Sequence, residues 1–173
     1  MSTIKQKTEA ATRVLKTHKA WQDNGRDKYL NALHVTDDQK IFMCDGFRAI
    51  AINTALPLPV MVDNAEYQTM TKTLYAHIEK AAQNDREVTT PSIEYLKAIQ
   101  KDHRKKKKAG KPVDPFALYD AGGYYVQAKL LADILQLIDD AKIFVKSQTK
   151  KYCELVYITG SNGAACLCPV RRI

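Results

Sequence analysis

The 173-residue sequence predicts an α+β fold made of two copies of one unit, a helix followed by three strands. Two segments, 7–20 and 128–139, carry apolar residues at helical spacing. Each is followed by three short apolar segments that are separated by polar or glycine-containing turns. The stretch between the two units, 55–115, has a different pattern. We therefore expect a single domain, 1–173, whose two repeat helices lie on the same face of one sheet.

The first unit covers residues 1–54. Ala10, Val14 and Leu15 form the apolar stripe of its helix, and Asn24-Gly25 ends the segment as a turn. Asp45-Gly46 predicts a sharp bend between the second and third strands. The strands are expected at 28–35, 40–44 and 47–53.

The second unit covers residues 116–173 and repeats this order. Gly122-Gly123 interrupts the chain, and 124–127 is expected to be extended before the helix begins. Gly160-Ser161-Asn162-Gly163 is typical of a hairpin turn between the last two strands. The strands of this unit are expected at 142–147, 152–159 and 164–170.

The insertion between the units, 55–115, is expected to be helical. Prolines mark both borders, two near its start and two near its end. One helix is predicted from about 63 to 83 and another from about 92 to 107, where Ser92 could cap the N-terminus.

The formal net charge of +8 comes mainly from one short segment of the insertion. Lysine and arginine side chains displace the counterions that condense on DNA, so this segment predicts a non-specific, salt-dependent affinity for DNA phosphates. The alternative is a solvated, partly frayed helix end, because like charges three and four residues apart disfavour a helix. No aromatic residue interrupts the run, so base stacking is not expected from it. Its basic residues are Lys101, Arg104, Lys105, Lys106, Lys107, Lys108 and Lys111.

Several classes of function find no support in the sequence. No apolar run approaches the ~20 residues that cross a bilayer, and the N-terminus lacks an apolar secretion signal, so we expect a cytoplasmic protein. Cys166 and Cys168 have no metal-ligand spacing to a histidine or another cysteine. The four histidines are scattered, and neither a nucleophile elbow nor a phosphate-binding glycine-rich loop occurs. We expect no enzyme, no metal and no cofactor.

Stretches in both units carry a family resemblance. Leu30 is followed by Asp45-Gly46-Phe47-Arg48 and an apolar tail, and the chain ends near Pro169-Val170-Arg171. In this order they resemble a domain of the bacterial DNA sliding clamp, the β subunit of DNA polymerase III. The sequence departs from the family at Lys28, where proline is usual, and at Cys44, where threonine is usual. The insertion has no counterpart in the family.

The resemblance implies a DNA-clamp-like fold and a non-catalytic, sliding-clamp-like protein that binds DNA, replication or repair proteins, or both. Clamp helices face DNA through basic residues, which implies Arg13 and Lys16 as DNA contacts. Family chains carry several such domains in a ring, so a single domain implies a homo-oligomer. The alternative is a protein-interaction scaffold, with the insertion as its partner surface and no encirclement of DNA. The family's partner-peptide groove corresponds to Gly46, Phe47, Arg48, Pro169, Val170 and Arg171.

Overall fold

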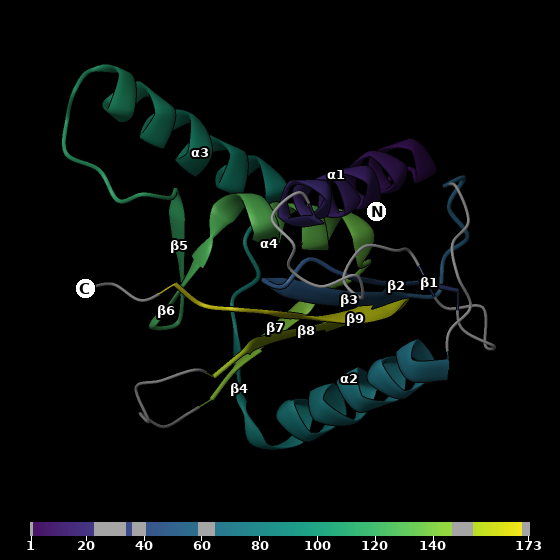
Figure 1. Cartoon of the computed structure of the whole chain (residues 1–173). Helices are drawn as coiled ribbons and strands as arrows, with labels where there is room; N and C mark the ends of the chain where they lie inside the picture. The colour runs from purple at the N-terminus through teal and green to yellow at the C-terminus, as the bar shows by residue number, and fades with distance from the viewer. Residues whose placement is uncertain (1, 23–33, 36–40, 59–64, 147–153, 171–173) are drawn as a thin grey trace.

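The computed structural model describes residues 2–22, 34–35, 41–58, 65–146 and 154–170. Its centre is a seven-stranded antiparallel sheet in the order β1-β2-β3-β9-β8-β7-β4 (Figure 1). These strands are β1 (His34–Val35), β2 (Ile41–Cys44), β3 (Arg48–Ile52), β4 (Arg86–Val88), β7 (Lys142–Val145), β8 (Val156–Gly160) and β9 (Gly163–Leu167).

The two predicted units are visible in this order. α1 (Ile4–Gln22) precedes β1, β2 and β3, while α4 (Ala128–Leu137) precedes β7, β8 and β9. The units meet where β3 pairs with β9, and each continues outward from that seam. Both repeat helices lie on the same face of the sheet (Figure 1). The predicted α+β class is therefore confirmed.

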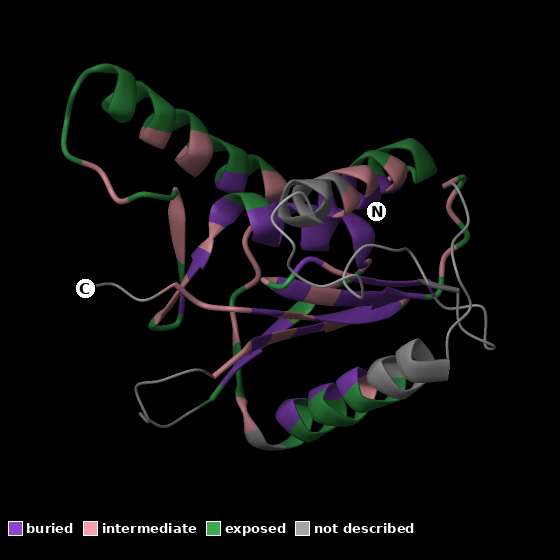
Figure 2. Cartoon of the chain, viewed as in Figure 1, coloured by how far each residue is buried: buried purple, intermediate pink, exposed green. Residues whose placement is uncertain are grey.

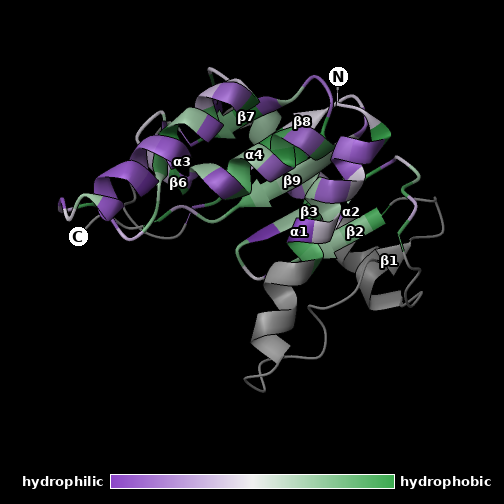
Figure 3. Ribbon diagram, turned by 90° about the horizontal axis from the view of Figure 1, so that it is seen from above, coloured by the Kyte–Doolittle hydropathy of each residue, from purple (hydrophilic) through white to green (hydrophobic). Residues whose placement is uncertain are grey.

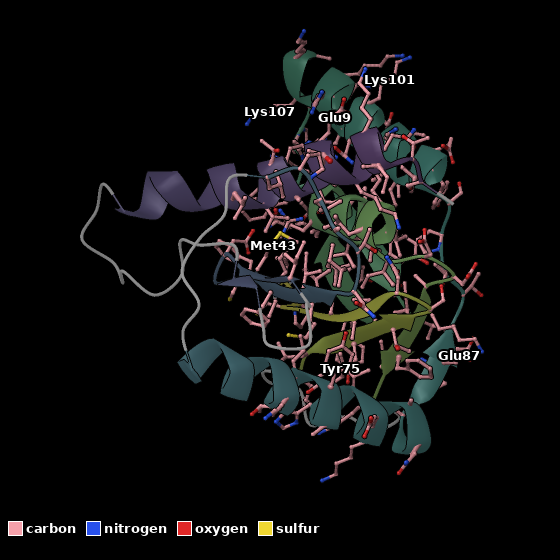
Figure 4. All side chains as sticks on the ribbon, turned by 90° about the vertical axis from the view of Figure 1, so that its right-hand side faces the viewer. Glu9, Met43, Tyr75, Glu87, Lys101 and Lys107 are labelled. Atoms are coloured by element: carbon pink, nitrogen blue, oxygen red, sulfur yellow. The ribbon has the colours of Figure 1, made fainter. Side chains whose placement is uncertain are left out.

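The main core lies between this helical layer and the sheet. α4 buries nearly its whole length, including Leu131, Ile134 and Leu137, because apolar residues occupy most of its circumference. Alternate residues of the strands, such as Ile158 on β8, reach the same core. Met43 lies between the sheet and the helices in Figure 4.

The insertion is not only helical, as predicted: besides two helices it contributes one strand to the central sheet. α2 (Ala65–Asn84) covers the opposite face of the sheet, where its Leu74 and Ile78 pack on Phe42 in a second, smaller core (Figures 1 and 2). β4 adds a strand beside β7 that the sequence analysis missed. α3 (Ile93–Lys108) returns to the helical layer and packs on α4. The hairpin β5 (Leu118–Ala121) and β6 (Tyr124–Gln127) then leads into α4, and β5 was also missed.

Element boundaries differ from the predictions by a few residues. α1 begins at Ile4 rather than at residue 7 because Thr3 and Gln6 form a capping box: the Thr3 hydroxyl accepts from the Gln6 N–H (3.2 Å), and the Gln6 side chain accepts from the Thr3 N–H (2.9 Å). The first predicted strand, 28–35, lies mostly outside the described residues, which show only β1. Among the described helices, none has the length and apolarity of a membrane span.

Candidate nucleic-acid interface

α3 carries the predicted basic segment, and its N-terminal half fixes it to the body of the protein. Ser92 caps the helix, its hydroxyl accepting a hydrogen bond from the Tyr95 N–H (3.1 Å). Leu96 is fully buried in the core against α4, and Ile93 and Ile99 pack partly around it. The apolar stripe therefore anchors one side of α3 and leaves its remaining sides to solvent.

The basic run is helical to its end at Lys108. The Gly110 N–H donates to the Lys107 carbonyl and the Lys111 N–H to the Lys106 carbonyl, both at 3.1 Å. Gly110 has φ of 67°, the left-handed conformation that this helix-ending motif requires. Every residue from Arg104 to Lys111 is exposed, and this half of α3 extends past the body of the protein (Figure 2).

One side of α3 forms what we call the cationic face. Successive residues turn by about 100°, so spacings of four, seven, eight and eleven residues return to the same side. An open hollow of about 690 Å³ lies along this side and is lined by α3 residues alone. In Figure 3 much of the α3 ribbon has the colour of hydrophilic residues, and Lys101 and Lys107 project into solvent in Figure 4. The face consists of Lys97, Lys101, Arg104, Lys105, Lys107 and Lys108, with Gln100 among them.

The opposite side of α3 has a different chemistry. Lys106 pairs with Asp102 (2.7 Å), and the Lys106 ammonium lowers the pKa of that carboxyl. The His103 ring Nε2 lies 2.8 Å from the Asp114 carbonyl oxygen and holds the returning loop against the helix. A cavity of about 680 Å³ opens between this side and the hairpin β5–β6, with the exposed Phe116 on its wall. Lys106 is thus placed away from the cationic face.

Two described cations of α1, Lys7 and Arg13, are turned toward acids in or just after α4, whereas Lys5 is exposed. The Arg13 Nε donates to Asp133 (2.6 Å), and Arg13 also donates to the Gln136 side-chain oxygen. Lys7 is buried and forms an ion pair with Asp139. Arg13, a predicted DNA contact, therefore lies in a network between two helices. The side chain of Lys16 lies outside the described residues.

The predicted groove residues come from stretches that the fold brings side by side. The Cys168 N–H donates to the Phe47 carbonyl (2.8 Å), which places Pro169 next to the β2–β3 turn. The Val170 N–H donates to the Tyr125 carbonyl (2.6 Å), which ties the same segment to β6. Gly46 is exposed at that turn, while Phe47, Pro169 and Val170 are half-buried. Arg171 lies outside the described residues.

Arg48, in contrast, cannot line a groove because its side chain is completely buried. It donates to Asp45 (3.0 Å) within the turn and to Asp133 (3.0 Å) on α4. A third bond, to the Leu130 carbonyl, is also 3.0 Å long. Arg48 thereby links the first unit to the helix of the second, and the buried Asp133 joins Arg48 and the partly exposed Arg13 in one ionic network.

Two of the described cysteines, Cys44 and Cys166, carry thiols that burial disfavours as thiolates. Burial raises the pKa of the Cys44 thiol, and it raises the pKa of Cys166 to about 11, so both are protonated at neutral pH. Within the part of the chain that the structure describes, no three His, Cys, Asp or Glu side chains gather as metal ligands.

Sequence reasoning missed one member of the cationic face, Lys97. It lies before the dense basic run, in a stretch of mixed composition. The signal was nevertheless present, because Lys97 is four residues before Lys101 and eleven before Lys108. Helical spacing, rather than local charge density, identifies it.

The resemblance to sliding clamps rests on the residues quoted above and on the order of the elements. Comparison of the chain with protein-family models, curated proteins and solved structures returns no match.

Proposed function

We propose that this chain is a non-catalytic, clamp-like, cytoplasmic domain that binds DNA through the cationic face of α3. The observation that carries the proposal is the gathering of six exposed cations on one side of a helix that is capped at both ends. Because the helix is already formed, binding does not have to offset the entropy cost of ordering a loop.

The charge balance of α3 favours a polyanionic partner. The helix holds seven cations against two acids, Glu94 and Asp102. Like charges three and four residues apart destabilise a helix, and Asp102 offsets only its neighbour Lys106. Phosphates along a nucleic-acid backbone would remove this repulsion and release condensed counterions. Such contacts go to the backbone, so the binding would not depend on base sequence.

The arrangement of the two units supports the clamp-like part of the proposal. Each unit is a helix and three strands, and the units share one sheet through the β3–β9 seam. Replication or repair proteins are proposed partners at the surface where the Phe47 turn meets Pro169. We also propose a homo-oligomer, which size-exclusion chromatography with light scattering would test.

The binding test compares two double variants with the same loss of charge. Lys101→Gln with Lys105→Gln removes two cations from the cationic face. Lys106→Gln with Lys142→Gln is the matched control. Both lysines are exposed, both lie away from the cationic face, and each forms an ion pair, Lys106 with Asp102 and Lys142 with Glu87. Fluorescence anisotropy with duplex DNA across a salt series gives the slope of log affinity against log salt.

We expect the first variant to bind more weakly, with the slope smaller in magnitude by about 1.8, since each phosphate contact contributes about 0.9. The control should keep the wild-type slope. Equal weakening of both variants would show that only net charge matters, and absence of binding by the wild-type protein at low salt would refute the proposal.

A second function, the interaction scaffold, is favoured by the cavity beside α3. Its wall combines Phe116, which is 45% exposed, with further apolar residues such as Val113 and Leu118. Removing the whole insertion would not test this role, because α2 covers one face of the sheet. Phe116→Ser is the sharper variant. If the chain is a scaffold, this variant should keep its DNA affinity and lose its binding to a purified replication protein.

A further inference from the structure

The helical layer distributes its charges unevenly. α4 lies in the middle, packed against α1 on one side and α3 on the other. Lys7 and Arg13 of α1 pair with acids that follow or belong to α4. The exposed charges among the described side chains of α1 and α4 are few: Lys5, Glu9 and Lys129.

α3 differs in position as well as in charge. It occupies the rim of the layer, and its C-terminal half extends beyond the sheet and beyond α4 (Figures 1 and 3). The cationic face lies on this rim helix, and its six cations span residues 97–108, or about 16 Å of helix axis at 1.5 Å per residue. The charge needed to hold a phosphate backbone is therefore concentrated at one edge of the molecule.

We propose that the protein docks on one phosphodiester backbone from outside, through α3 alone, and does not encircle its DNA. This inference rests on the proposed function and adds the mode of binding. In the ring that the clamp resemblance implies, cations on the repeat helices would face the DNA. Here two of the three described cations of α1, Lys7 and Arg13, pair with Asp139 and Asp133 instead. A rim helix, in contrast, can reach any continuous backbone without threading.

DNA topology separates the two modes. The wild-type protein is bound to a covalently closed circular duplex, which is then cut once with a restriction nuclease, and dissociation is followed against an excess of competitor DNA. A one-sided binder should leave the circular and the cut DNA with the same rate constant. A ring would be held on the circle and lost from the free ends, so its half-life on the circle would be longer by about tenfold or more.

A charge variant of the layer provides the second arm. Lys5→Gln with Lys129→Gln removes two exposed cations from α1 and α4, the same charge as Lys101→Gln with Lys105→Gln removes from α3. We expect the first pair to keep the wild-type affinity and salt slope, and the second pair to bind more weakly with a slope smaller in magnitude by about 1.8. Circular dichroism and urea unfolding confirm that each variant is folded.

Three outcomes are distinguishable. Equal rate constants together with loss of binding only in the α3 variant would support one-sided docking. Longer retention on circles, or weakening by Lys5→Gln with Lys129→Gln, would overturn one-sided docking while DNA binding itself stands. Absence of binding to circular and linear DNA alike would refute the proposed function as well.

Discussion

α1 and α3 flank the same helix and are both rich in basic residues, yet they use them differently. The described cations of α1 that face α4, Lys7 and Arg13, are in ion pairs with Asp139 and Asp133. The cations of α3 project into solvent, and α3 meets α4 through the apolar Leu96 instead. A basic helix therefore indicates a polyanionic partner only when its cations have no acidic partners within the fold.

The difference follows from the two sides of α4. The side toward α1 presents Asp133 and Gln136, which are polar although they are buried. Arg13 and Arg48 satisfy Asp133 from two directions, one from each neighbouring element. α3 meets α4 through Leu96, which belongs to the same apolar cluster as Leu131 and Leu135, so the basic residues of α3 turn outward.

The largest expected effect comes from breaking the ion pairs that Arg48 forms with Asp45 and Asp133. Arg48→Ala leaves Asp45 and Asp133 buried without their shared cation, which should lower the free energy of unfolding by about 3–5 kcal/mol. Urea unfolding measures this loss. Lys142→Ala is the control, because its pair with Glu87 is exposed and should contribute less than about 1 kcal/mol. A similarly small loss for Arg48→Ala would contradict a stabilising role for the network.

The next largest loss of stability is expected from weakening the contact between α3 and α4. Leu96 is the fully buried residue of α3, so Leu96→Ala should cost about 3 kcal/mol through lost burial and the cavity left behind. Tyr95→Ala is its control, because Tyr95 is 57% exposed. If the two variants unfold at the same urea concentration, then α3 is held by something other than its apolar stripe.

One substitution in each helix should separate stability from DNA binding. Arg13→Gln should lower the free energy of unfolding by about 1 kcal/mol, because its partner Asp133 keeps Arg48. It should leave DNA affinity unchanged. Lys105→Gln should do the reverse, weakening binding with a stability change within about 0.5 kcal/mol. Anisotropy and urea unfolding on the same samples would reveal any exchange of these roles.

The smallest expected effect is local to the end of α3. A Cβ at position 110 would meet no atom within 4 Å, so Gly110→Ala introduces only backbone strain at φ of 67°, about 1 kcal/mol, confined to the last turn. Hydrogen exchange should show loss of protection at the last turn of α3. Gly123→Ala is matched to it, with φ of 99° and equally open space, and should leave α3 unaffected.

Much of the fold could be predicted from patterns of neighbouring residues. The apolar faces of α1 and α4 and the turns at Asp45-Gly46 and Gly160 to Gly163 are local signals, and the structure has elements where they indicate them. β4 could not be found this way, because three residues in the order Arg-Glu-Val carry no alternation. The sequence analysis missed the capping box of Thr3 and Gln6, although the spacing of these two residues is a local signal.

The candidate site was predictable only in part, because burial depends on distant residues. The basic run of α3 is visible in the sequence, and so is the helical spacing that adds Lys97. Arg13 looks equally basic until the fold brings Asp133 to it from 120 residues away. Likewise, Arg48 matches a functional position of the resembled family, and only tertiary structure shows that its side chain is buried.

The β3–β9 seam has a consequence for how the chain folds. Each unit contains a hairpin of neighbouring strands, β2–β3 and β8–β9, that can form quickly because its contacts are local. The seam joins strands more than a hundred residues apart, and the insertion lengthens the loop that must close. The entropic cost of closing a loop rises by only about 0.6 kcal/mol for each doubling of its length. The insertion therefore slows the pairing of β3 with β9 more than it destabilises that pairing. We therefore expect the two units to collapse separately and the seam to close last.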